Sequence, residues 1–474
     1  MQEQTQSRIE VTKDSIIDSI SNSAAIPLQS STSRIPRLPK MAREKDDYMK
    51  YYVPKVVSVG PYHFGNSNLQ YAETLKPHLT MRLLKDNKET LRRLFDNLSE
   101  PETVQHLRCF YEENSTANFC DMEFSKMMLL DSCFILYYIR IFFGGSLEDH
   151  PELSRKQLAN VYEDLLLLEN QIPFEVLTNV TKLMETTDGL KDNIEKFISA
   201  VSFVRPRRRK RTWLQNIKEM CWLFCIRNDP SSNGGDADDD EKPTHLLAAV
   251  RGKLTKTVKT PKPVVNPFKY DAWNFRNVSE LVDVGIYFKA IEQTTSLTHV
   301  DFVKNWWGFS ANVKIPPITL YDETRQLLLN MTAYETYCCS IYDAWVTSYV
   351  CLLDSLIDKI EDVKVLRKGW VIHNHLSSDK EVATLFEEIA IDLFPNSLAY
   401  YEAMNKIQTH YESLSNTLFS QLKNEYFKSP WAIFALLGAL IALFLAGVQT
   451  YFTVWSPESK CDDLCVFLKM NHHL

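Results

Sequence analysis

Residues 431–455 read WAIFALLGALIALFLAGVQTYFTVW, a stretch without a single Asp, Glu, Lys or Arg. A helix rises about 1.5 Å per residue, so roughly 20 apolar residues cross about 30 Å of hydrocarbon. Trp431 and Trp455 stand at its two ends, where the aromatic residues of membrane helices gather at the lipid–water interface. The stretch therefore predicts a membrane-spanning helix that separates a large domain from a short tail.

A second apolar stretch, residues 127–143, precedes it far upstream. It contains Asp131 and Arg140 and is shorter than a span requires. We therefore expect a helix buried in the core of the large domain, and a single pass through the membrane.

Composition excludes several classes of protein. The chain has 474 residues and a formal net charge of −7, so no global basic field favours nucleic acid as a partner. Only 13 residues are glycine, which disfavours folds built on phosphate-binding loops. The ten cysteines are scattered and do not form the pattern of a disulfide framework.

The pattern of the chain predicts a mainly α fold: one large helical domain with a small β element in its second half, plus the C-terminal transmembrane helix. Residues 1–45 are polar and unpatterned and are expected to be a flexible leader. The helical domain is expected over 46–428, the span over 431–455 and a short tail over 456–474.

Two long amphipathic helices and four strands are expected within the domain. Apolar spacing predicts one helix over 158–172, ended by Pro173, and another from Trp345 that closes near Gly369. Clusters of β-branched residues predict the strands, at 285–288, 300–302, 313–315 and 318–320.

A charged insertion, expected to be disordered, interrupts the domain at about 205–242. Its acidic stretch SSNGGDADDDE lacks the means to pack, and the preceding Cys221 and Cys225 are candidates for acylation if the loop touches a membrane. The insertion begins with basic residues that are usually only solvated but are also candidates for contact with anionic lipid: Arg205, Arg207, Arg208, Arg209, Lys210 and Arg211.

Signatures of catalysis are missing from the chain: it has no G-x-S-x-G, H-E-x-x-H or P-loop motif. The weak candidates for acid–base chemistry are Asp131 and Glu169, because burial raises the pKa of a carboxyl group, and His63. The favoured interpretation is that both carboxylates are buried polar groups satisfied by backbone donors and that His63 is a structural hydrogen-bonding residue. His373 and His375 would share one face of a strand, but no further ligand lies nearby, so neither a metal nor a cofactor is expected.

Several motifs resemble the large plant family known as domain of unknown function 247. They include VPKVVSVGPYHFG at 53–65, FSKMMLLDSCFIL at 124–136, LLLLENQIPFEVL at 165–177 and IPPITLYDETRQLLLNMTAYE at 315–335. The resemblance covers about residues 45–455 in order. It implies a mostly helical, single-pass membrane protein without an established enzymatic activity. Some grass members of that family are implicated in self-incompatibility, which implies a role in recognition.

Together these features predict a plant protein-interaction or recognition protein, tail-anchored in the plasma membrane or an endomembrane, with an unknown protein partner. The large domain is expected in the cytosol because no signal peptide precedes it. Five N-x-S/T sequons keep the opposite topology open: Asn97, Asn114, Asn179, Asn277 and Asn330. The alternatives are an enzyme of unrecognised type that uses the buried carboxylates, and a lipid-surface-binding protein that acts through the basic run.

Overall fold

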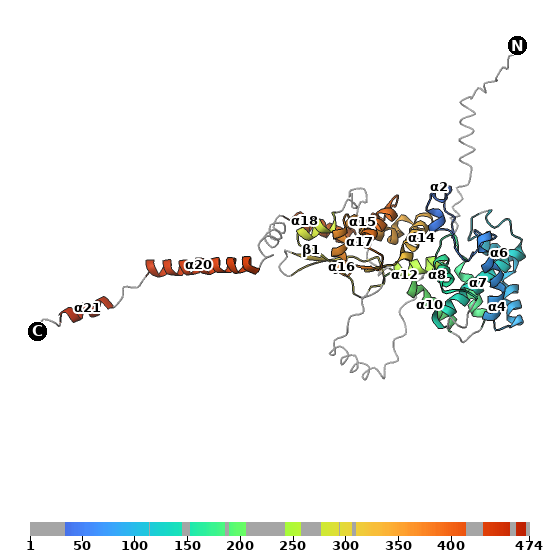
Figure 1. Cartoon of the computed structure of the whole chain (residues 1–474), viewed down its shortest axis with the longest axis horizontal. Coiled ribbons are helices and arrows are strands. Elements are labelled where there is room, and N and C mark those ends of the chain that lie inside the picture. Colours follow the sequence, from blue (N-terminus) through green and yellow to red (C-terminus); the bar gives the residue numbers. More distant parts are fainter. Residues whose placement is uncertain are drawn as a thin grey trace, which may run out of the picture.

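The computed structural model describes residues 34–112, 114–144, 152–184, 189–204, 242–256, 276–292, 294–305, 310–413, 430–455 and 461–470. Most of these residues are helical, and the strands among them are short and confined to the second half of the chain (Figure 1). The mainly α fold with a small β element is therefore confirmed. The basic run, Cys221 and Cys225 lie outside the described residues.

The first half of the domain packs around one long helix, α7, whose apolar run was expected to be a core helix. Phe134, Leu136 and Ile139 of α7 are buried, and helices α4, α5, α9 and α10 contact it. Local signals place the neighbouring helix ends: Ser154 caps α8 and exchanges hydrogen bonds with Gln157. The helices of this half are α2 Lys40–Arg43, α3 Tyr48–Tyr51, η1 Ser67–Leu69, α4 Gln70–Leu83, α5 Lys88–Leu98, α6 Pro101–Arg108, α7 Asp121–Gly144, α8 Arg155–Asp164, α9 Phe174–Leu183 and α10 Leu190–Val201.

Part of the expected leader belongs to the packed domain. Ile35 and Leu38 are buried in the core, and the Ile35 N–H donates to the carbonyl of Phe110 over 2.8 Å. Residues 34–45, which the sequence analysis assigned to the leader 1–45, therefore include core residues.

The second half surrounds two small sheets. Strand β3 lies between β1, to which it is parallel, and β2, to which it is antiparallel, while β4 and β5 form a separate parallel pair. The elements are α12 Leu246–Leu254, α13 Val278–Asp283, β1 Ile286–Ala290, β2 Asp301–Lys304, β3 Ala311–Ile315, β4 Ile318–Leu320, α14 Asp322–Cys338, η4 Ile341–Asp343, α15 Trp345–Leu356, α16 Ile360–Lys368, β5 Ile372–Asn374, α17 Asp379–Ala390 and α18 Tyr401–Tyr411.

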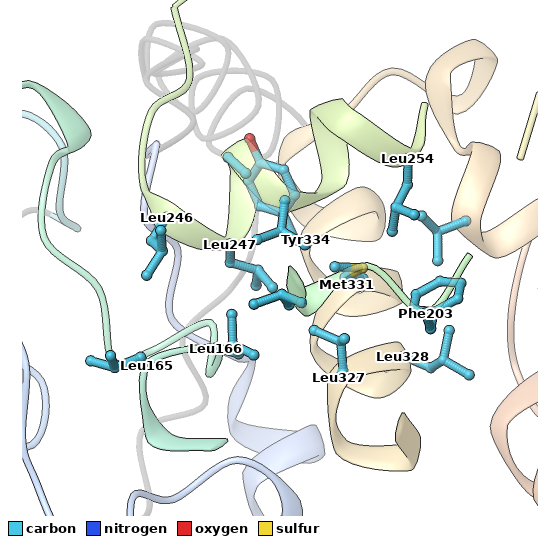
Figure 2. Packing of buried hydrophobic residues seen from close by; sticks show 14 of the residues in the cluster. Leu165, Leu166, Phe203, Leu246, Leu247, Leu254, Leu327, Leu328, Met331 and Tyr334 are labelled. Carbon is cyan, nitrogen blue, oxygen red and sulfur yellow. The ribbon is translucent and has the colours of Figure 1, made fainter. Parts of the chain in front are cut away.

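Helices α12 and α14 join the two halves into one hydrophobic core. Figure 2 shows Leu247 of α12 facing Met331 and Tyr334 of α14, with Leu166 of the first half beside them. A buried ion pair also joins these helices, because Arg251 Nε donates to Glu335 Oε1 over 2.7 Å. Glu335 in turn accepts the N–H of Val346 at the start of α15.

Both long amphipathic helices are shorter than expected. Helix α8 ends at Asp164, and residues 165–172 form a buried loop although their apolar spacing is helical. The second helix is two helices, α15 and α16, separated at residues 357–359. The Asp362 side chain stabilises that break by accepting the N–H groups of Asp358 and Lys359, at 3.1 and 2.9 Å.

The C-terminal helix α20, Pro430–Val454, is followed by α21, Cys461–Met470. Residues 434–454 of α20 are apolar enough and long enough to cross a membrane, with a mean hydropathy of 1.9, and none of this stretch is buried against the domain. Trp455 is 72% exposed and stacks on Tyr451, with ring centroids 6.3 Å apart. The side chain of Trp431 lies outside the described residues.

Candidate functional site

A cluster of buried polar side chains holds the extended segment 55–60, and we call it the buried polar cluster: Lys76, Asp131, Asp164, Glu169 and Asn170. Asp164 accepts the backbone N–H groups of Lys55, Val56 and Val57 over 2.8, 2.7 and 3.0 Å. Burial raises the pKa of Asp164 to about 6, and these three donors oppose that shift. One carboxylate at the end of α8 thus satisfies three consecutive backbone groups.

Asn170 and Asp131 continue the same pattern along the segment. The Asn170 side chain accepts the N–H of Val59 over 2.7 Å, and its amide group donates to two backbone carbonyls. Asp131 on α7 accepts the N–H of Gly60 over 2.7 Å. Lys76 Nζ lies 2.6 Å from the other carboxylate oxygen of Asp131 and also donates to the Ser58 carbonyl. Burial raises the pKa of Asp131 to about 6, and the Lys76 charge opposes the shift.

Glu169 and His63 lie at the outer end of the cluster. Glu169 accepts the N–H of Leu38 over 2.7 Å and the hydroxyl of Tyr48 over 2.8 Å. Burial raises the pKa of Glu169 and lowers that of His63 to about 4, so the imidazole is neutral at neutral pH. His63 Nε2 and Glu169 Oε2 are 3.7 Å apart, too far for a good hydrogen bond.

The candidate catalytic carboxylates are therefore occupied by structural contacts. Asp131 and Glu169 face backbone N–H groups, and the linings of four surface pockets of the described residues are made by other side chains. Sequence reasoning identified the burial of Asp131 and Glu169 but missed Asp164. A carboxylate directly before four leucines was the available signal.

An open groove of about 490 Å³ lies on the second half of the domain. We call it the Trp370 groove, because its most exposed large apolar side chain is that of Trp370, 47% exposed. Its lining comes from the end of α16, from β5 and from the residues between and after them: Lys364, Arg367, Lys368, Trp370, Ile372, His373, Asn374 and His375. No acidic residue is among these described lining residues. The groove is therefore basic and aromatic.

The backbone beneath Trp370 has a conformation that normally requires glycine. Helix α16 ends in a Schellman motif, in which the Val371 N–H donates to the Leu366 carbonyl and the Trp370 N–H to the Arg367 carbonyl. The residue in the left-handed position is Trp370, with φ of +62°. A left-handed conformation costs a residue with a side chain about 1–2 kcal/mol.

Glycine occupies the preceding position for a steric reason. A Cβ atom on Gly369 would lie 2.3 Å from the carbonyl oxygen of Phe288, since β1 passes directly against this turn. Strain of this kind persists where the surroundings enforce it and is common at ligand-binding positions. The Trp370 side chain is thus displayed in the groove on a strained backbone.

The two histidines expected on one strand both line the groove. His373 lies in β5, with its ring centroid 5.7 Å from that of Trp370, and His375 stacks on Tyr321 at 4.6 Å. No group of three potential metal ligands occurs among the described residues. The pair therefore contributes ring surface to the groove.

A protein-family profile described as a plant protein of unknown function, DUF247, matches residues 35–445. The chain belongs to the DUF247 family. Two relatives from Arabidopsis thaliana are similar along most of their length. UPF0481 protein At3g47200 is 27% identical in an alignment that covers 86% of this chain and 83% of the relative. Putative UPF0481 protein At3g02645 is 21% identical in an alignment that covers 85% of this chain and 87% of the relative. No solved structure matches this DUF247 chain significantly.

Proposed function

We propose that this DUF247 protein is a membrane-tethered binding protein, whose helical domain presents a surface to a protein partner in the service of signalling or self/non-self recognition. The proposal rests on the contacts that the candidate catalytic side chains make. Asp131 and Glu169 bind backbone donors inside the domain, whereas the accessible Trp370 groove offers cations and aromatic rings. Aromatic and basic side chains are typical of protein-binding surfaces.

Tethering is part of the same proposal. Helix α20 exposes an apolar surface long enough to cross a bilayer, and exposed apolar surface of this size is unfavourable in water. We propose that α20 anchors the chain in the plasma membrane or an endomembrane and leaves the domain in the cytosol. Contact of the basic run at 205–211 with anionic lipid would add to this anchor.

Charge substitutions in α20 test the anchor. The double variant Leu440→Arg/Phe444→Arg places two charges near the middle of the span, each unfavourable for insertion by about 2.5–3.5 kcal/mol. The full-length variant is expected to leave the alkaline-carbonate membrane pellet, whereas Leu440→Ala/Phe444→Ala is expected to stay there. Retention of the charged variant would contradict the tether.

Glycosylation at the sequons would report on which side of the membrane the domain lies. Asn330 is fully buried and cannot accept a glycan in the folded domain, while Asn97, Asn114 and Asn179 retain exposed surface. A cytosolic domain predicts no mass change on endoglycosidase treatment. A decrease in mass that Asn114→Gln reduces would place the domain on the opposite side.

Proximity labelling from the intact protein in its native tissue tests the binding role. Reproducible enrichment of specific protein partners is expected, relative to a matched tail-anchored control that lacks the domain. Enrichment equal to that control would contradict the proposed function.

A further inference from the structure

We propose that the Trp370 groove binds an extended, acidic segment of a partner protein. The inference rests on the proposed function and specifies where and how the partner is recognised. Three independent properties of the groove support it: its charge, its displayed tryptophan and its edge strand.

The charge of the groove selects an acidic ligand. Lys364, Arg367 and Lys368 are exposed at its rim, and its described lining contains no carboxylate. Arg367 is held by Asp379, whose two carboxylate oxygens both lie 2.7 Å from its Nη1 atom, and Lys364 lies 3.6 Å from Glu361. Lys368 has no ion pair among the described residues, which leaves it the most available cation in the groove.

Trp370 supplies an apolar anchor at the centre of this rim. Its indole is 47% exposed although the positive φ beneath it favours glycine, and His373 lies beside it. Tryptophan and arginine are the residues most enriched at the energetic centres of protein interfaces. An apolar side chain of the ligand would pack on Trp370 while its acidic neighbours meet the lysines.

Strand β5 supplies a backbone edge. It is the outer strand of a two-stranded parallel sheet, paired only with β4 among the described residues, and Ile372, His373 and Asn374 line the groove. An extended peptide can add to such an edge and place alternate side chains on one face. This geometry favours an extended segment over a docked helix.

A compact anion fits the groove less well. Phosphate is held by convergent donors, commonly a bidentate guanidinium, and the guanidinium of Arg367 is already bound to Asp379. The remaining cations are separate exposed lysines. An extended chain can reach such separated groups together.

Fluorescence anisotropy with the full-length chain in detergent micelles tests the assignment. The probe is a fluorescein-labelled pool of short peptides with Asp or Glu at alternate positions and varied apolar residues between them. A pool with Lys in place of the acidic residues and a labelled oligouridylate serve as competing probes. The wild-type chain is expected to bind the acidic pool and neither of the others.

Two variants locate the binding in the groove. Trp370→Gly and Lys368→Glu are each expected to weaken binding of the acidic pool by about tenfold or more. Lys156→Glu, which makes the same charge change on the exposed face of α8, and Phe394→Ser, which removes an exposed ring elsewhere, are expected to leave binding unchanged. Because glycine suits the left-handed turn, Trp370→Gly should keep or raise the Tm, so its effect on binding is separable from misfolding.

Three outcomes would overturn the inference: no binding of the acidic pool by the wild-type chain, equal binding by Trp370→Gly, or preferential binding of oligouridylate with the same sensitivity to the variants. Proximity labelling separates this failure from failure of the proposed function. If specific partners are still enriched, only the assignment of the groove is wrong; if enrichment also fails, the binding role is wrong.

Discussion

The buried polar cluster and the Trp370 groove both contain a lysine, but Lys76 of the cluster is buried and Lys368 of the groove is exposed. In the cluster, Asp131 accepts the Gly60 N–H and pairs with Lys76, Asp164 accepts three backbone N–H groups, and both carboxylates are buried. In the groove, Lys368 and Trp370 are exposed. The exposure of a polar group to solvent, more than its residue type, therefore separates a structural role from a role in recognition.

The two regions also differ at their left-handed turns. Gly60 of the cluster has φ of +77° and Trp370 of the groove has φ of +62°. The buried turn carries the residue that relieves strain, whereas the exposed turn carries a large aromatic residue that increases it.

Removal of one partner from the buried ion pair is expected to have the largest effect. Asp131→Ala leaves Lys76 buried with Glu73 as its remaining ion-pair partner and frees the N–H of Gly60, and should reduce the free energy of unfolding by about 3–5 kcal/mol in chemical denaturation. The double variant Lys76→Met/Asp131→Leu should lose less than Asp131→Ala, since it removes both fully buried charges and leaves only the partly exposed Glu73, which still accepts the Ser58 hydroxyl. A loss below about 1 kcal/mol for Asp131→Ala would show that the pair is not structural.

A methyl group at Gly60 should destabilise the cluster almost as much. A Cβ atom there would lie 2.5 Å from the Gln171 carbonyl oxygen in addition to the strain of the positive φ, so Gly60→Ala should cost about 3 kcal/mol. Gly65→Ala is the matched control, because Gly65 has a φ of +82° and open space around its Cβ position. It should cost only the strain, about 1 kcal/mol. Equal losses would contradict the steric explanation.

A buried histidine near the junction of the halves should make stability depend on pH. Burial lowers the pKa of His245 to about 3, so between pH 6.5 and 3 this imidazole carries a proton in the unfolded chain but not in the folded chain. The contribution of His245 to the free energy of unfolding should therefore fall by about 1.4 kcal/mol for each pH unit by which the pH is lowered.

The control for this prediction is His245→Asn, which keeps an acceptor for the N–H of Ala248 at the start of α12 but has no proton to bind. The raised pKa values of Asp131 and Asp164 act in the opposite direction in both chains, since the folded chain then holds more protons below pH 6. The difference between the two chains isolates His245. If the free energies of unfolding of the wild-type chain and of His245→Asn change equally with pH from 6.5 to 4, the prediction is contradicted.

The smallest effect is expected at Trp370. Trp370→Gly should raise the free energy of unfolding by about 1 kcal/mol, because glycine adopts the left-handed conformation without strain. Trp370→Ala removes the ring but keeps the Cβ atom, and should therefore bring no such gain. If both variants destabilise the domain equally, the indole is a packing residue and the contrast between the two regions disappears.

Local patterns predicted those elements whose partners are close in sequence or whose surface is uniformly apolar. The apolar run at 127–143 lies in α7, and the clusters of β-branched residues at 285–288, 313–315 and 318–320 overlap β1, β3 and β4. His373 and His375 were expected on one strand; β5 contains His373 and ends at Asn374, one residue before His375. In each case the spacing of the apolar residues indicates which face of the helix or strand is buried.

Prediction failed where the backbone is satisfied by distant side chains. Residues 165–172 have helical spacing, yet the N–H of Leu168 donates to the side chain of Asn330, 162 positions away. This bond replaces a helical one, and no local pattern encodes it. The same holds for the Trp370 groove, which requires α16, β5 and the approach of β1 to Gly369.

Periodicity, length and motif order are properties of the linear chain, and they were enough to predict the helical class, the apolar C-terminal helix and the plant family. The contacts of Asp131 and Glu169 with the backbone, and the exposure of Trp370 among cations, could be read only from the folded domain. The physical reason is that burial and hydrogen-bond partners depend on residues far apart in the chain. Solvent access, which separates a structural polar group from a binding one, exists only after folding.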